Sequence, residues 1–371
     1  MQNPFTHAFG ARPNKYISTL LEESIIENFR YSSPSERCYM LTGVRGSGKT
    51  VMMSSVAKTL AGEDEWFICN LILTEDIINQ FAAKLAENKH CAKLFIKTTG
   101  INLSVAALSA GIEYDKETVF DLSTLIARMI ESISKQGQKV LITIDDIFMS
   151  DGMVRFAQLF QYLLTDSREL PVYLIMTGLY QNYREITDVG NQKLRGCTFL
   201  TRTLEREVPP LDESQMVVSY YNTFGIDEKE AIKLAKMTKG YAFAYQVLGY
   251  WYFEKYINKN ESVRDVEVEY RSELIKYSYG KLWTELSDKD RVIIKALVKL
   301  DADKNVVKRK DVIEYMNENN EPITSSVFNK YRERLLGKGI IGASDNRDGN
   351  LWLPLPEFGN YIRLYHMEEY V

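Results

Sequence analysis

The stretch Gly43-Val44-Arg45-Gly46-Ser47-Gly48-Lys49-Thr50 decides the fold of this chain. It fits the pattern of a glycine, four residues and Gly-Lys-Ser/Thr, which predicts a loop whose N–H groups surround the phosphates of a nucleotide. Glycine lets such a loop close around an anion, and the following helix favours negative charge at its N-terminus. Lys49 is expected to reach the β- and γ-phosphates, and the Thr50 hydroxyl to ligate Mg²⁺. The predicted nucleotide contacts are Gly43, Val44, Arg45, Gly46, Ser47, Gly48, Lys49, Thr50 and Val51.

The residues on either side of this loop have the pattern that the motif requires. Residues 38–42 form a short apolar run typical of a buried strand, and residues 51–57 open a helix. The alternative is a glycine-rich turn that fits the pattern by chance. The order of strand, loop and helix favours the phosphate-binding loop.

Composition places the chain among ordinary globular proteins. It has 371 residues, 45% hydrophobic and 26% charged, with a net charge of −4, and this length suggests two or three domains. The cysteines are scattered singly and the histidines form no local cluster, so neither a disulfide framework nor a zinc site is expected. No apolar run is as long as a membrane span, and the first residues do not resemble a signal peptide. We therefore expect a cytoplasmic protein with no membrane partner.

Apolar, often β-branched runs alternate with helical segments through the first half of the chain. Such alternation predicts a parallel sheet covered by helices, an α/β fold. The expected strands are 38–44, 66–73, 139–147, 171–178 and 206–208, and the expected helices are 17–31, 50–60, 75–87, 119–134 and 152–164. The segment 101–114 breaks the alternation and is interpreted as a β-hairpin or ordered insertion.

The second half of the chain is mainly helical. Segments 213–224, 228–239, 243–257 and 266–286 predict a small helical bundle. From Ser287 onward, three helices and then a hairpin around a turn at 346–350 follow one another, an order typical of a winged helix. The predicted domains are a lead-in at 1–36, a P-loop core at 37–211, a helical lid at 212–286 and a winged-helix domain at 287–371.

A phosphate-binding loop needs a carboxylate nearby to hold Mg²⁺, and the strand that ends before Asp145-Asp146 supplies it. Ligands of open α/β sheets bind at the carboxyl ends of the strands, where these two carboxylates are expected. We assign the metal-associated role to Asp145 and the polarisation of the attacking water to Asp146. The alternative, an acidic turn after a strand, is weakened by the phosphate-binding loop in the same chain.

Two catalytic expectations follow from this edge of the sheet. Many ATPases carry Glu where Asp146 stands, and the shorter side chain holds its carboxylate back from the water, so we expect slow or partner-dependent hydrolysis. Thr177, at the end of the next expected strand, is a candidate contact to the γ-phosphate or the water. With Asp146 and Lys49 it completes the predicted catalytic set.

The order of phosphate-binding loop, acidic strand, polar-ended strand, helical lid and winged helix resembles that of AAA+ ATPases of the initiator (origin-recognition) type and of STAND-like archaeal and bacterial ATPases. Residues 3–6 (Asn-Pro-Phe-Thr) and Phe9-Gly10 are similar to the box that these families place beside the adenine. The chain departs from the family pattern at three places, the last being that no arginine finger is obvious and that each candidate arginine has a surface residue as its open alternative. The Gly-Arg that often follows the box is replaced by Ile17-Ser18-Thr19, and the lid's Gly-x-Pro reads Gly240-Tyr241-Ala242, without the lid arginine of the initiator type.

The resemblance also implies an arginine finger and a DNA-binding winged helix. Arg202 is the candidate finger, with Arg195 and Arg206 nearby. The block from Ser287 holds 14 basic and 14 acidic residues, which argues against strong nonspecific DNA binding. Its third helix is locally basic, however, and a basic helix with a wing arginine suits a DNA groove. The candidate contacts to double-stranded DNA are Lys330, Arg332, Arg334 and Arg347. A winged helix that binds protein instead is the open alternative.

The sequence as a whole predicts an α/β P-loop ATPase of AAA+-like fold, with a helical lid and a C-terminal winged helix. It is expected to bind ATP with Mg²⁺, to hydrolyse it to ADP and to reposition its lid and winged helix with nucleotide state. A nucleotide-dependent switch or scaffold with negligible turnover, acting through a protein partner or a homo-oligomer, is the main alternative. A small-molecule kinase is a further one, disfavoured by the winged helix.

Overall fold

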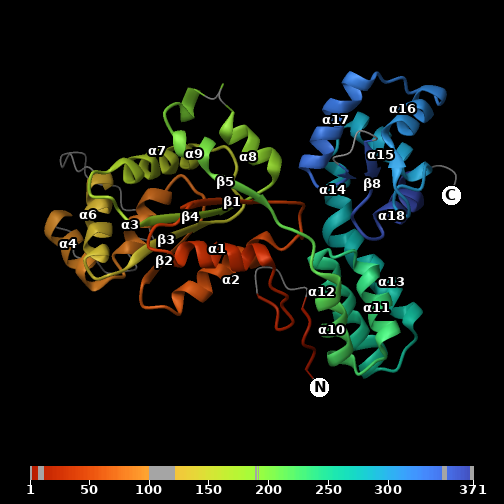
Figure 1. Ribbon diagram of the computed structural model, residues 1–371, viewed down its shortest axis with the longest axis horizontal. Helices are drawn as coiled ribbons and strands as arrows, with labels where there is room; N and C mark the ends of the chain where they lie inside the picture. Colours follow the sequence, from red (N-terminus) through yellow and green to blue (C-terminus); the bar gives the residue numbers. More distant parts are fainter. Residues whose placement is uncertain are drawn as a thin grey trace. The chain divides into compact units, whose positions relative to one another are not determined.

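The computed structural model describes residues 2–6, 12–99, 122–188, 190, 192–344 and 349–367, and the chain divides into two compact units (Figure 1). We call Leu20–Thr42 with Lys49–Glu207 the sheet unit, and Met1–Thr19 with Gly43–Gly48 and Val208–Val371 the lid–wing unit. The lid and winged helix predicted as separate domains thus share one compact unit, and the lead-in is divided between both. The four-part division of the chain stays a prediction.

The sheet unit is built on a five-stranded parallel sheet, as predicted. Its strand order is β2-β3-β4-β1-β5. The strands are β1 (Cys38–Thr42), β2 (Trp66–Leu71), β3 (Lys139–Ile144), β4 (Val172–Thr177) and β5 (Leu204–Glu207). The first four end one to three residues earlier than expected, because the residues that follow them belong to loops. β5 begins two residues earlier than the expected Arg206.

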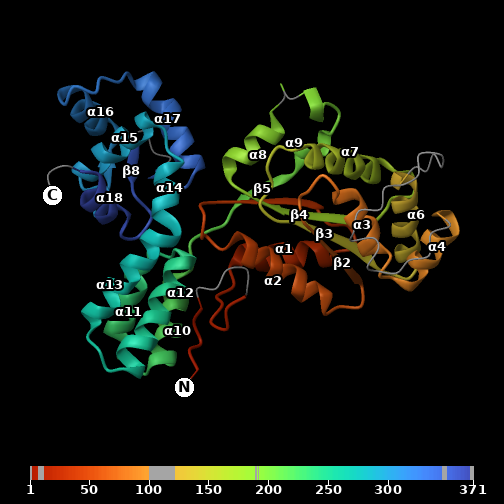
Figure 2. The same cartoon turned by 180° about the vertical axis from the view of Figure 1, so that it is seen from behind.

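Helices cover both faces of this sheet. Figures 1 and 2 show α1 and α2 on one face and α7 on the other. Side chains alternate accordingly: the Tyr39 and Tyr173 rings lie against Phe29 of α1, whereas Met40 and Leu174 join the core on the opposite face. The helices of the sheet unit are α1 (Leu20–Arg30), α2 (Lys49–Ala61), α3 (Ile77–Leu85), α4 (Lys89–Thr99), α6 (Leu122–Ser134), α7 (Asp151–Thr165), α8 (Tyr180–Thr187), η1 (Gln192–Leu194) and α9 (Thr198–Arg202).

The predicted helices of the sheet unit are confirmed with shifted ends, but α4, α8, η1 and α9 were not predicted. These elements are short or lie beside other helices, and their residues lack a long apolar repeat. The hairpin or insertion predicted for residues 101–114 lies outside the described residues.

The lid part of the second unit contains the predicted bundle, with two helices that change pitch. Its elements are α10 (Glu213–Phe224), α11 (Glu228–Thr238), α12 (Ala242–Trp251), η2 (Tyr252–Asn258), α13 (Val263–Leu274), η3 (Ile275–Tyr279) and α14 (Gly280–Thr284). Turns of π-helix, η2 and η3, extend α12 and join α13 to α14, so the expected helices 243–257 and 266–286 each comprise more than one element.

The C-terminal part of the same unit is a winged helix, as predicted from the order of its elements. It consists of α15 (Asp288–Lys299), β6 (Val307–Lys308), α16 (Arg309–Glu318), α17 (Ser325–Gly337), β7 (Gly342–Ala343), β8 (Asn350–Trp352) and α18 (Phe358–His366). The strands form an antiparallel sheet in the order β6-β8-β7. Strand β6 and helix α18 were not predicted.

Residues 3–6 of the N-terminal box pack on the lid, whereas Phe9-Gly10 lie outside the described residues. Phe5 is 2% exposed and its ring lies against those of Tyr220, Phe224 and Tyr245. Asn3 donates from its side-chain amide to the Tyr250 carbonyl (3.1 Å) and to the Glu254 carboxylate (2.8 Å). The box therefore fixes the lead-in to the lid, whereas its predicted contact with adenine is untested.

In the described ranges, no helix combines the length and apolar character needed to cross a membrane.

Candidate nucleotide-binding site

The strand order brings three chemically important strand ends together. Strand β4 lies between β1, which leads into the phosphate-binding loop, and β3, which leads into Asp145. In the register of these strands Leu41 pairs with Thr177, and Ile144 pairs with Met176. The hydroxyl of Thr177 is therefore placed between the end of β1 and the acidic pair.

Asp145 points toward the first turn of α2. It continues the alternation of Leu141 and Thr143, the face of β3 opposite the core that contains Val140 and Ile142. The Thr50 hydroxyl donates to both Asp145 carboxylate oxygens, at 2.9 and 3.0 Å. The two residues predicted to hold Mg²⁺ thus meet, although they are far apart in the sequence.

Thr177 holds the acidic pair from the neighbouring strand. Its side chain is 1% exposed, and its hydroxyl donates to Asp145 Oδ1 while accepting from the backbone N–H of Asp146 (3.1 Å). The hydroxyl is thus engaged by protein groups on both sides. Its predicted contact with the γ-phosphate or the water stays a prediction, and the geometry indicates a positioning role.

Asp146 is exposed and has a left-handed backbone, with φ of 51°. Aspartate tolerates this conformation better than most side chains do. The next residue is fixed as well, because Ile147 donates its N–H to the Thr177 carbonyl (2.8 Å) and accepts from Asn182 Nδ2 at its own carbonyl (2.9 Å). The turn after β3 is therefore fastened to the end of β4, and it presents the Asp146 carboxylate to solvent.

The phosphate-binding loop has the backbone that its glycines predict. Gly43, Gly46 and Gly48 have φ angles of 146°, 81° and 97°, and Ser47 donates its N–H to the Val44 carbonyl (3.1 Å). The Ser47 hydroxyl oxygen is buried and has no hydrogen-bond partner among the described residues. A buried hydroxyl without a partner in a glycine-rich loop fits an anion-binding cradle.

Residues of the lid contact this loop from within the same compact unit. The Tyr241 hydroxyl donates to the Arg45 carbonyl (2.5 Å), and Phe243 donates its N–H to the Gly46 carbonyl (3.1 Å). A Cβ at Gly46 would lie 2.3 Å from the Tyr241 hydroxyl oxygen, so only glycine allows this approach. The sequence showed Gly240-Tyr241-Ala242 only as a departure from a family pattern. It did not predict the contact of Tyr241 with Arg45.

The donor set suits Mg²⁺ that arrives with a nucleotide. Mg²⁺ in such sites is held by one or two protein oxygens together with substrate phosphates. A hydroxyl and a carboxylate, those of Thr50 and Asp145, meet this need. In the described part of the chain, no group of three or more His, Cys, Asp or Glu side chains could hold a metal by itself.

A cavity of about 420 Å³ lies beside the Thr50–Asp145 pair, in the sheet unit. Residues of α2, β2 and β3 line it, among them Ser54, Lys58 and Asn70. Two of its lining residues are joined, since Thr143 donates to Asn70 Oδ1 (2.7 Å). The cavity leaves the metal-associated pair accessible from the side of α2.

The candidate arginine finger is exposed. Arg202 ends α9, and its side chain makes no hydrogen bond or ion pair with another described residue; Arg195 is exposed in the preceding loop. Arg206 is also exposed, and it donates to the Glu205 carbonyl (3.2 Å). Their role in a finger stays a proposal.

The candidate DNA contacts of α17 differ in their surroundings. Arg334 donates to Asp290, which is 1% exposed, and to the Ser287 hydroxyl (2.7 Å). Lys330 is exposed, and Arg332 has a buried Nε without a hydrogen-bond partner in the described ranges. Arg347 lies outside the described residues. Arg334 thus neutralises a buried carboxylate of the winged helix.

Comparisons with known proteins agree with this architecture. No protein-family model and no curated protein matches the sequence. Among solved structures, a Walker-type ATPase of Pyrococcus abyssi is similar over 94% of this chain and 96% of its own, with a TM-score of 0.62 and 16% identity. The ORC2 protein of Aeropyrum pernix, solved in ADPNP–ADP complexes, is similar over 92% of each chain, with a TM-score of 0.52 and 10% identity.

At these identities the comparisons concern the fold. The chain has the fold of the initiator-like AAA+ ATPases: a parallel P-loop sheet, a helical lid and a C-terminal winged helix. The resemblance inferred from the motifs is thereby confirmed for the fold.

Proposed function

We propose that the protein binds ATP with Mg²⁺ at the phosphate-binding loop and hydrolyses it slowly to ADP and phosphate. The observation that carries this proposal is the pairing of Thr50 with Asp145, at 2.9 and 3.0 Å, directly after a loop with the glycine geometry of a phosphate cradle. The two similar solved structures support the fold on which this chemistry is common.

Each group at the site has a distinct task in this proposal. The loop N–H groups and Lys49 bind the phosphates, and Thr50 and Asp145 supply oxygens to Mg²⁺. Bound Mg²⁺ would offset the charge on the β- and γ-phosphates. Asp146 orients and polarises the attacking water, and Thr177 keeps Asp145 and Asp146 in place through its hydrogen bonds.

Nucleotide state is proposed to act on the lid and winged helix. The lid residues Tyr241 and Phe243 contact the phosphate-binding loop, so a change in the conformation of the loop would act directly on the lid. An exposed Arg202 from a second copy would stabilise the negative charge that develops on the phosphates in the transition state. Turnover would then depend on protein concentration.

A second candidate function is a nucleotide-dependent switch with negligible turnover that acts through a protein partner. Two observations favour it. The candidate water-polarising residue is the short Asp146, and the lid segment 240–243 offers tyrosine and phenylalanine rather than an arginine. We propose duplex DNA as a partner of Lys330 and Arg332. Arg334 is left out of this set, because it pairs with Asp290.

The proposed function is tested first by the binding of ATP. Titration calorimetry with Mg·ATP should detect binding to the wild type and to Lys236→Ala, which removes an exposed lysine of the lid. Lys49→Ala should bind at least about tenfold more weakly, because a phosphate-directed charge is lost. Equal affinity of all three proteins would reject the loop as the nucleotide site.

A further inference from the structure

The segment Lys239-Gly240-Tyr241 joins two functional parts of the lid–wing unit. At one end, the Tyr241 hydroxyl donates to the Arg45 carbonyl of the phosphate-binding loop (2.5 Å) and lies 3.0 Å from the Ser278 hydroxyl. Burial raises the pKa of Tyr241 to about 12, so the phenol keeps its proton at neutral pH and can donate it to a carbonyl. Its ring is 6% exposed, so the hydroxyl has little freedom to bind elsewhere.

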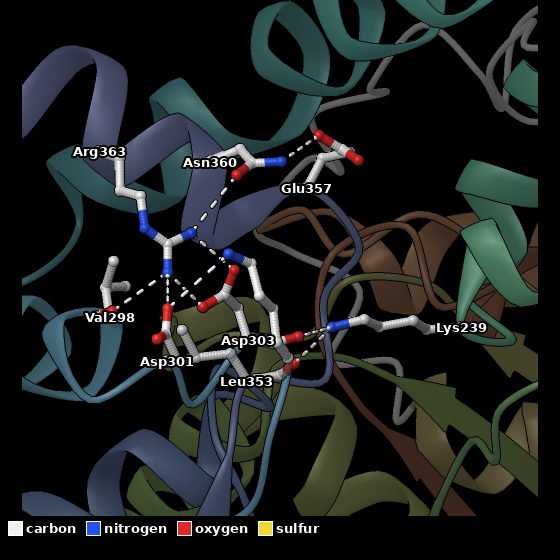
Figure 3. Close-up of polar contacts among 9 residues, drawn as sticks. Lys239, Val298, Asp301, Asp303, Leu353, Glu357, Asn360 and Arg363 are labelled. Carbon is white, nitrogen blue, oxygen red and sulfur yellow. Dashed lines mark hydrogen bonds and ion pairs between the residues drawn. The ribbon is translucent and has the colours of Figure 1, made fainter. Parts of the chain in front are cut away.

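At the other end of the segment, Lys239 binds the winged helix. Its ammonium donates to the backbone carbonyls of Asp303 (2.7 Å) and Leu353 (3.1 Å), as Figure 3 shows. Partial burial lowers the pKa of Lys239, and the nearby Asp303 and Glu357 carboxylates oppose that shift. Two carbonyls from different parts of the winged helix are thus held by one lysine.

The winged-helix side of this contact is itself tightly braced. Arg363 of α18 donates to both carboxylate oxygens of Asp303 (2.7 Å each), to Asp301 (2.9 Å) and to the Val298 carbonyl (3.1 Å) (Figure 3). The Leu353 N–H in turn donates to the Ala302 carbonyl (2.8 Å). A displacement of Lys239 would therefore act on the end of α15, the strand β8 and α18 together.

The backbone in the middle of the segment is restricted by its conformation and by close contacts. Lys239 and Gly240 both have left-handed backbones, with φ of 49° and 74°. Gly240 accepts from the Leu211 N–H (2.8 Å), and a Cβ at Gly240 would lie 2.8 Å from Pro210 Cβ and 2.9 Å from the Leu211 carbonyl oxygen. A short segment that is wedged in this way moves as one piece rather than flexing.

The winged helix also touches the loop directly. Gly339, which follows α17 with φ of 65°, lies so close to Val44 that an added Cβ would be 3.0 Å from Val44 Cβ. Val44 is packed against the hydrophobic core of the lid–wing unit. Two neighbouring loop residues, Val44 and Arg45, are thus in contact with the winged helix and with the lid tyrosine.

We propose that Lys239-Gly240-Tyr241 is a coupling segment, which transmits the conformation of the phosphate-binding loop to the winged helix. The signal that it carries, bound nucleotide, rests on the proposed function. Tyr241 contacts the loop, Lys239 holds the winged helix, and the left-handed Lys239-Gly240 pair connects them. A nucleotide that changes the Arg45 and Gly46 peptide groups shifts Tyr241, and with it the carbonyls of Asp303 and Leu353.

Hydrogen exchange of backbone amides tests this coupling on the full-length protein. The amides of Lys304, Asn305 and Leu353 are hydrogen-bonded beside Lys239, so their exchange reports on the winged-helix end. Addition of Mg·ATP should change their exchange rates about fivefold in the wild type and in Lys236→Met. In Lys239→Met this change should be lost, while the ATP affinity stays within about twofold of wild type. A full ATP-dependent change in Lys239→Met, or none in the wild type that binds ATP, would overturn the proposal.

A second comparison tests the segment without nucleotide. Gly46→Ala forces a methyl group against the Tyr241 hydroxyl, whereas Gly137→Ala introduces the same methyl at φ of 80° with no atom within 4 Å. The exchange rate of the Leu353 amide should change in Gly46→Ala and stay unchanged in Gly137→Ala. When Lys239→Met is combined with Gly46→Ala, the change at Leu353 should be lost. Unchanged exchange in Gly46→Ala rejects the coupling. Failure of ATP to bind, with this response intact, would reject only the proposed function.

Discussion

The Thr50 hydroxyl lies 2.9 Å from one carboxylate oxygen of Asp145 and 3.0 Å from the other, although a further strand separates β1 from β3 in the sheet. The pair meets because Asp145 continues the face of β3 that is directed toward α2. A hydroxyl and a carboxylate that converge at the start of a helix form one half of an oxygen shell for Mg²⁺.

Removal of the Thr50 hydroxyl should weaken nucleotide binding only when Mg²⁺ is present. We expect Thr50→Val to lower the affinity for ATP with Mg²⁺ by about tenfold or more, and to leave the affinity in a chelator nearly unchanged. Thr59→Val, on the same helix, is the matched control. Calorimetry with and without Mg²⁺ measures both, and an equal loss in the two conditions would contradict a metal role for Thr50.

Thr177 should act on turnover and stability rather than on nucleotide affinity. Thr177→Val keeps the shape of the side chain and removes the hydrogen bonds to Asp145 and from the Asp146 N–H. We expect turnover to fall about tenfold, because the acidic pair loses its fixed position. The free energy of unfolding should fall by about 1–3 kcal/mol, because Asp145 and the Asp146 N–H each lose a hydrogen bond to the buried Thr177.

Rescue by serine distinguishes a hydroxyl effect from a packing effect at this position. Thr177→Ser should recover most of the turnover, as measured by phosphate release. If Thr177→Val bound ATP at least tenfold more weakly and turned over bound ATP normally, the γ-phosphate contact would be the better account of Thr177.

The length of the side chain at position 146 should set the rate of hydrolysis. Asp146→Glu extends the carboxylate by one methylene, and we expect turnover to rise about threefold or more. Asp146→Asn removes the base, and turnover should fall about a hundredfold with ATP affinity retained. Single-turnover phosphate release separates these effects from binding. Turnover in Asp146→Asn equal to that of wild type would exclude Asp146 as the group that polarises water.

The two exposed basic residues of α17 should behave differently. Arg334→Ala leaves Asp290 buried without its cation, so the winged helix should lose about 1–3 kcal/mol of stability. Lys330→Ala should leave the melting temperature unchanged and weaken the binding of duplex DNA. Thermal unfolding and a fluorescence titration with duplex DNA measure the two quantities. A stable Arg334→Ala that loses DNA affinity would return this residue to the DNA-binding set.

The phosphate-binding loop and the acidic strand could be predicted because each motif consists of a few consecutive residues. The strand–loop–helix order around Gly43–Thr50 and the apolar run before Asp145 need no distant partner to be recognised. The lid helices and the winged helix were predicted from apolar spacing and helix caps. Ser287 and Asp290, for example, form the capping box that opens α15.

The rest of the site depends on contacts between distant residues. Tyr241 meets Arg45 across 196 positions, and Arg334 meets Asp290 across 44 positions. Residue type alone cannot separate an arginine that reads DNA from one that neutralises a buried carboxylate. Phe5 likewise has the same sequence signature whether it lies beside a nucleobase or, as here, in the core of the lid.

The central claim is tested most directly by steady-state hydrolysis of ATP at several protein concentrations, with and without duplex DNA, against Lys49→Ala as the blank. The account predicts slow, Mg²⁺-dependent release of phosphate from the wild type that exceeds the blank and rises with protein concentration or with a partner. Release no higher than that of Lys49→Ala under every condition would contradict an active ATPase, and would leave ATP as the ligand of a switch.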